Sequence, residues 1–62
     1  MASMDDAAEV DRVAAEFLRR HGPSVIADLR EQAEMAAATG DQLSAEAWTD
    51  IADAAERLLK RQ

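Results

Sequence analysis

The sequence has 62 residues, no cysteine, and a formal net charge of -6 from 7 basic and 13 acidic residues. This length accommodates one domain, residues 1–62, and the lack of cysteine excludes stabilisation by disulfides. The acidic balance would repel a phosphate backbone, and no apolar run approaches the roughly 20 residues of a membrane span, so we expect neither nucleic acid nor a membrane as partner.

The first expected helix covers residues 5–20. Its apolar residues recur at the three-and-four spacing that places them on one helix face. They are Ala7, Val10, Val13, Ala14, Phe17 and Leu18. The segment Met1 to Asp6 has neither the basic start nor the apolar stretch of a secretory signal, which predicts a cytoplasmic protein.

The second expected helix covers residues 23–38. Gly22 can adopt the left-handed conformation that ends a helix, and Pro23 suits a first helical turn, where a missing N–H costs nothing. The inward face tapers from larger side chains to alanine: Val25, Ile26, Leu29, Ala33, Ala36 and Ala37. We therefore expect the wide part of the core near Val25 to Leu29. Met35 falls outside this face and is a candidate interface residue.

The third expected helix covers residues 42–60, after a glycine stop at Gly40 and a cap by Asp41 or Ser44. One apolar stripe comprises Leu43, Ala47, Ile51, Ala54, Ala55 and Leu58. Trp48, Ala52 and Leu59 continue this stripe around the helix, so that at about 100° per residue the apolar arc covers roughly half the circumference. Because such an arc can face two partners, these three residues are candidates for an interface with a second chain.

Two short turns favour antiparallel neighbours, so the sequence predicts an all-α fold, a three-helix up-down-up bundle with the first and third helices parallel. The alternative is a helical hairpin whose first helix is swapped onto a second chain. Large apolar side chains are few, and neither a disulfide nor a metal-ligand cluster is available to stabilise the fold. This shortage favours self-association, and we expect a homodimer.

The bundle would gather opposite charges at its two ends. The expected basic pole, where an anion or an acidic partner would bind, comprises Arg19, Arg20, His21, Lys60 and Arg61. The expected acidic pole comprises Asp5, Asp6, Glu9, Asp41 and Glu46. The same pattern also complements the helix dipoles, with acids at helix starts and bases at helix ends, and this ordinary structural role is the more frequent one.

No group of residues predicts catalysis. His21 is the one side chain that titrates near neutral pH, but the sequence places no nucleophile or orienting partner beside it. The acidic pairs Asp50 with Asp53 and Glu31 with Glu34 stand at helix-neighbour spacing, which is more typical of a solvated face than of a cation site. We therefore assign no catalytic residue, no cofactor and no metal, and expect a protein that is not an enzyme.

The spacing of His21-Gly22, Gly40-Asp41, Trp48, Ile51-Ala52 and Leu58 resembles a family of short uncharacterised bacterial proteins, a domain of unknown function. That family has an HG turn, a GD turn and a tryptophan-containing helix. The resemblance covers about two-thirds of the chain and implies no activity, ligand or catalytic residue.

Two functional hypotheses follow from the sequence. The first is a helical protein-interaction module that associates with itself, or with another protein, through its apolar seam. The second is a regulatory binder of a small anion or ligand at the basic pole.

Overall fold

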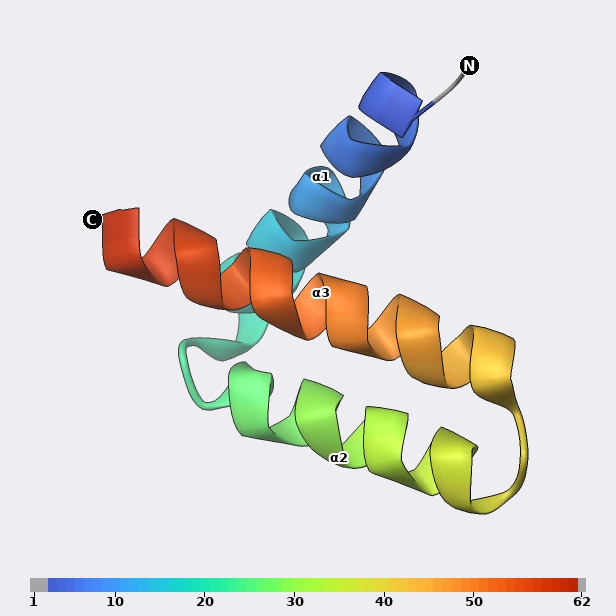
Figure 1. Cartoon of the computed structure of the whole chain (residues 1–62). Coiled ribbons are helices and arrows are strands. Elements are labelled where there is room, and N and C mark those ends of the chain that lie inside the picture. Colours follow the sequence, from blue (N-terminus) through green and yellow to red (C-terminus); the bar gives the residue numbers. More distant parts are fainter. Residues whose placement is uncertain (1–2, 62) are drawn as a thin grey trace.

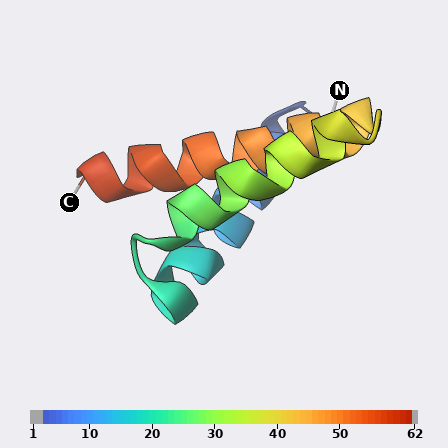
Figure 2. The ribbon, with the colours of Figure 1, turned by 90° about the horizontal axis from the view of Figure 1, so that it is seen from below.

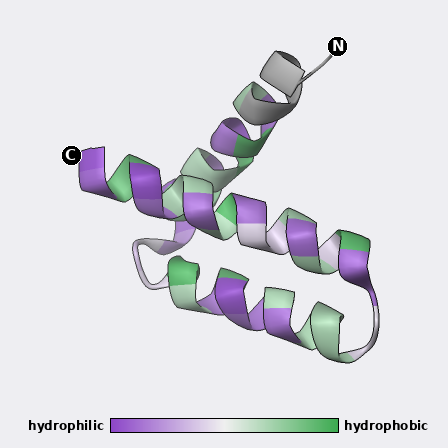
Figure 3. Ribbon diagram, in the orientation of Figure 1, coloured by the Kyte–Doolittle hydropathy of each residue, from purple (hydrophilic) through white to green (hydrophobic). Residues whose placement is uncertain are grey.

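The computed structural model describes the backbone of residues 3–61 and the side chains of residues 8–61. Three helices make up this part of the chain: α1 (Ser3–His21), α2 (Val25–Ala38) and α3 (Gln42–Arg61) (Figure 1). The predicted all-α class is confirmed. Hydrophobic and hydrophilic residues alternate around each helix (Figure 3), as expected for helices that bury one face.

Both turns are built on a glycine with a positive φ. Gly22 has φ 83° and Gly40 has φ 84°, conformations that only glycine adopts at little cost. At the second turn, Gly40 N–H donates to the Ala37 carbonyl at 3.0 Å and Asp41 N–H donates to the Ala36 carbonyl at 2.9 Å. This pair of bonds is the Schellman motif, so the sequence correctly predicted how α2 ends.

The start of α2 differs from the prediction. The helix begins at Val25, because Pro23 and Ser24 form a turn in which Val25 N–H donates to the Gly22 carbonyl at 3.1 Å. Ser24 occupies the cap position, but its side chain makes no capping hydrogen bond. The turn itself therefore determines where α2 starts.

α2 and α3 form an antiparallel hairpin, and α1 crosses α3 at a steep angle (Figures 1 and 2). α1 packs mainly on α3 and meets α2 only lightly, which gives the molecule a flat shape of 34 × 33 × 17 Å. The first and third helices are thus not parallel as the simplest bundle requires. Alanines explain the difference: Ala14 of α1 and Ala54 of α3 belong to one buried cluster, and such short side chains allow two helices to cross closely at one place.

The core contains few large side chains. Its buried residues are Ala14, Val25, Leu29, Ala45, Ala52, Ala54 and Ala55. Only Val25 and Leu29, which are 4% and 2% exposed, are larger than alanine, so the wide part of the core lies where the sequence predicted. Larger side chains pack around this cluster but stay partly exposed: Val10, Phe17, Leu18, Ile26, Trp48, Ile51 and Leu58.

Three residues assigned to buried stripes are exposed instead. Leu43 is 81% exposed, and Ala37 and Ala47 are also exposed. Leu43 lies in the first turn of α3, whereas α1 crosses the opposite half of that helix (Figure 1). Nothing in the described part of the chain covers the start of α3, so helical periodicity alone assigned this leucine wrongly.

Asp41, one of two residues considered as the cap of α3, is the one that accepts a backbone bond, from Ser44 N–H at 3.2 Å. Bonds from the Ser44 hydroxyl and N–H lower the pKa of Asp41 below its ordinary value of 3.8. A carboxyl group whose folded pKa is lowered stabilises the fold fully above its unfolded pKa, and this contribution is lost as pH falls through the folded pKa.

We therefore expect Asp41→Ala to lower the thermal midpoint at pH 7, and the difference from wild type to shrink below about pH 4. Asp41→Asn keeps a capping oxygen without the charge, so at pH 7 it should be more stable than Asp41→Ala and less stable than the wild type. Thermal unfolding followed by circular dichroism between pH 2 and pH 7 measures both effects. An Asp41→Ala deficit that stays constant over this range would show that the charge of the cap contributes nothing.

Candidate interaction surfaces

Two of the four predicted interface residues pack within the chain, Ala52 completely and Trp48 in part. Ala52 is 0% exposed, so it lies behind the surface and offers no contact to a partner in this structure. Trp48 is half-buried, and its ring packs against that of Phe17 at a centroid distance of 6.4 Å and an interplanar angle of 56°. This contact joins α3 to α1, which gives the tryptophan a packing role within the chain.

The other two predicted interface residues remain at the surface, on different helices. Met35 is 56% exposed on α2. Leu59 is half-buried near the end of α3, where it lines a groove between α1 and α3. An interface between copies that uses both residues must therefore join two different surfaces.

The groove between α1 and α3 that Leu59 lines has a volume of about 640 Å³, and we call it the α1–α3 groove. Its lining residues are Ala15, Leu18, Arg19, Pro23, Leu58, Leu59 and Arg61. Leucines of both helices supply the apolar lining, and two exposed arginines supply positive charge. This combination suits a ligand with an apolar group and a carboxylate or other anion beside it.

The predicted basic pole is only partly assembled. Arg19 and Arg61 share the α1–α3 groove, but Lys60 lines a separate shallow depression with Asp53, Glu56 and Arg57. Because α1 crosses α3 instead of running beside it, the helix ends that carry these charges do not converge on one point.

Local contacts also occupy part of this pole. Both Arg19 and Arg20 pair with Glu16 on their own helix, the Arg20 Nε to Glu16 Oε2 distance being 2.8 Å. The exposed His21 ring lies 6.2 Å, between centroids, from that of Phe17, so it contacts an apolar ring. Arg19 and Arg61 thus share the groove, and Arg19 is at the same time paired with Glu16.

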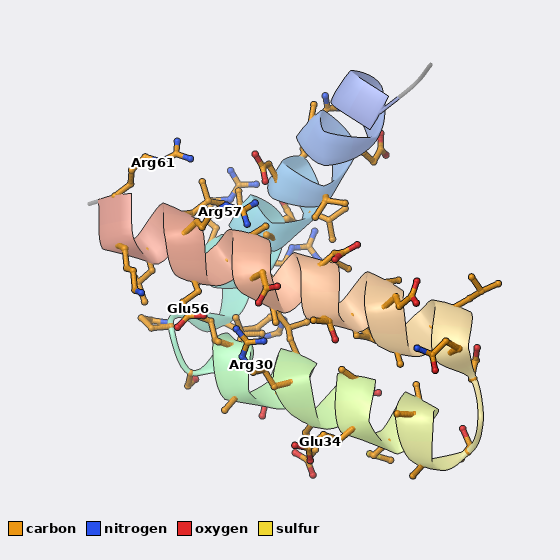
Figure 4. All side chains as sticks on the ribbon, viewed as in Figure 1. Arg30, Glu34, Glu56, Arg57 and Arg61 are labelled. Carbon is orange, nitrogen blue, oxygen red and sulfur yellow. The ribbon has the colours of Figure 1, made fainter. Side chains whose placement is uncertain are left out.

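An ion cluster between α2 and α3 was not predicted from the sequence. The Arg30 guanidinium donates to Asp53 Oδ1 at 2.9 Å and to Glu56 Oε1 at 2.7 Å, and Arg30 and Glu56 face each other in Figure 4. Both bonds raise the pKa of Arg30, and the bond to Asp53 has the larger effect. Asp53 and Glu56 are separated by three positions on one helix, which is the only sequence signal for such a pair. Asp53, considered above as a cation ligand, is thus engaged by an arginine.

The half of the hairpin nearest Gly40 is uniformly acidic. No lysine or arginine occurs between Arg30 and Arg57 in the sequence. Apart from Asp53 and Glu56, the acidic residues of this stretch are all exposed: Glu31, Glu34, Asp41, Glu46 and Asp50. In Figure 4, Glu34 lies on α2 towards the Gly40 turn, whereas Arg57 and Arg61 project from the C-terminal part of α3.

The predicted acidic pole is therefore found in part, at the Gly40 turn, where Asp41 and Glu46 lie. Glu9 belongs to α1, away from this turn, and the side chains of Asp5 and Asp6 lie outside the described residues. The hairpin is thus unevenly charged: its charged residues near Gly40 are all acidic, whereas Arg57, Lys60 and Arg61 lie near the end of α3.

No group of three or more histidine or acidic side chains among the described residues is arranged to hold a metal ion. No helix there is long and apolar enough to cross a membrane.

No family model, no curated protein and no solved structure matches the chain. The resemblance to short uncharacterised bacterial proteins therefore stays a prediction, and the function must be argued from the surfaces themselves.

Proposed function

We propose that this protein is a non-catalytic, self-associating helical interaction module. One observation carries the proposal: Val25 and Leu29 are the only side chains larger than alanine that are buried in the described part of the chain. The helices meet through alanines, and the larger apolar side chains are left around the rim of the core. A second copy that covers part of this rim would bury surface that one chain leaves in contact with water.

The energetics favour such an arrangement. Full burial of a valine or leucine side chain contributes about 1.5 to 3 kcal/mol, whereas fixing each residue costs about 1.5 kcal/mol of conformational entropy. With only Val25 and Leu29 buried among the larger side chains, one chain gains little beyond its alanine contacts. Association supplies the missing apolar burial, as is common for domains of this size that have no disulfide or metal.

We expect the weight-average mass, measured by light scattering or sedimentation, to rise above that of one chain as protein concentration increases. The test uses the full chain at constant pH and salt, with circular dichroism to check that helical content is unchanged. A mass equal to one chain over the whole concentration range would contradict the proposal. The cytoplasmic location expected from the sequence stays a prediction.

The second candidate function is anion binding, which the presence of Arg19 and Arg61 in one groove favours. Inorganic phosphate, titrated at constant ionic strength, should then raise the thermal midpoint of the wild type. Arg61→Gln should reduce this shift, while Arg12→Gln, which removes an arginine outside the groove, serves as the control. An equal shift in all three proteins would exclude specific binding in the groove.

A further inference from the structure

The start of α3 carries the most exposed large apolar side chain of the described residues. Leu43 is 81% exposed, compared with 56% for Met35. Glu46, Ala47 and Asp50 follow it at three, four and seven positions, so they share its side of the helix. The first turns of α3 therefore present a leucine flanked by carboxylates, with Ala47 adding apolar surface that a larger side chain would block.

The opposite end of α3 has the complementary character. There the α1–α3 groove offers an apolar lining that includes Leu18, Leu58 and Leu59, next to the guanidinium groups of Arg19 and Arg61. A leucine beside two carboxylates complements an apolar groove that is lined by two arginines, of which Arg19 also pairs with Glu16 of its own chain.

One chain cannot bring its own two surfaces together. Leu43 and Leu59 lie on the same continuous helix, and at 1.5 Å per residue they are about 24 Å apart along its axis. A leucine beside carboxylates also cannot pair with an identical surface, because the like charges would repel. Among copies of this chain, the match for each surface is therefore the other surface on a different copy.

We propose that the chain associates head-to-tail, with Leu43 of one copy in the α1–α3 groove of the next and with Glu46 and Asp50 beside Arg19 and Arg61. This inference rests on the proposed self-association and specifies the surfaces that meet. We call Leu43 together with Glu46 and Asp50 the knob. Each contact leaves one free knob and one free α1–α3 groove, so assembly continues into a closed ring or a longer chain. The groove lies apart from Met35, which takes no part in this contact.

Two variants test the contact by removing one side each. Leu43→Asp places a charge on the knob, and Arg61→Glu reverses the charge at the groove; both positions are exposed, so the fold should survive. We expect each variant alone to associate at least about tenfold more weakly than the wild type. An equimolar mixture should recover one contact, between the intact groove of the Leu43→Asp chain and the intact knob of the Arg61→Glu chain, and should stop at a mass of two chains.

Met35→Asp is the matched control, because it places the same charge on the other exposed large apolar residue. It should associate like the wild type. Weak association by Met35→Asp, together with normal association by Leu43→Asp, would overturn the head-to-tail contact and leave self-association standing. Two deficient variants that fail to recover on mixing would also overturn it. A wild type that stays a single chain at all concentrations would overturn both proposals, and would direct the search to a different protein as partner.

Discussion

Replacing Leu29 with alanine is expected to lower the free energy of unfolding by about 2 to 5 kcal/mol, a large part of the stability of a chain this short. Leu29 is 2% exposed and, with Val25, is one of the two residues larger than alanine in the buried core. Truncation of a buried leucine to alanine costs about 2 to 5 kcal/mol, because the cavity that remains is only partly filled by relaxation. Native domains typically have about 5 to 15 kcal/mol of stability, and a chain this short belongs at or below the lower end.

Leu43→Ala is the matched control for this experiment, since it makes the same change in a helical leucine that is 81% exposed. Its free energy of unfolding should stay within about 0.5 kcal/mol of the wild type. Urea denaturation followed by circular dichroism, at a concentration where each protein is a single chain, measures both values. Similar losses in the two variants would show that the buried position of Leu29 is not what holds the fold together.

Local features of the fold could be predicted from the sequence because a few residues determine them. The two glycines end helices through a positive φ that other residues adopt only with strain, and Asp41 places an oxygen beside free N–H groups. Apolar periodicity likewise indicated three helices and the position of Val25 and Leu29 in the core. These features depend on neighbours within about four positions in the chain.

The direction of α1 depends on tertiary packing and could not be predicted in this way. A helix that contacts its neighbour through alanine can cross at several angles, since no large side chain imposes a register. The steep crossing has two consequences for the candidate site. It separates the charges of the predicted basic pole, and it leaves the first turn of α3 uncovered, with Leu43 in water.

The candidate site was predicted in part for the same reason. The sequence named Leu59 as an interface candidate and Arg19 and Arg61 as members of a basic pole, but it did not place the three in one groove. Periodicity treats every apolar residue of a stripe alike, so it could not separate exposed Leu43 from buried Ala52. Nor does a single arginine such as Arg30 indicate which acidic residues on another helix it will bond.

Enlarging Ala52 to leucine is expected to destabilise the fold by about 1 to 3 kcal/mol, the usual cost of inserting a larger side chain into a packed core. Ala52 is 0% exposed, so the added atoms must displace neighbouring helices. Ala47→Leu makes the same change on an exposed surface of α3 and should alter the free energy of unfolding by less than about 0.5 kcal/mol. Denaturant unfolding at single-chain concentration compares the two variants. If Ala52→Leu were instead as stable as Ala47→Leu and associated more strongly, Ala52 would be a surface residue in solution, and the alanine-lined packing of α3 described above would be wrong.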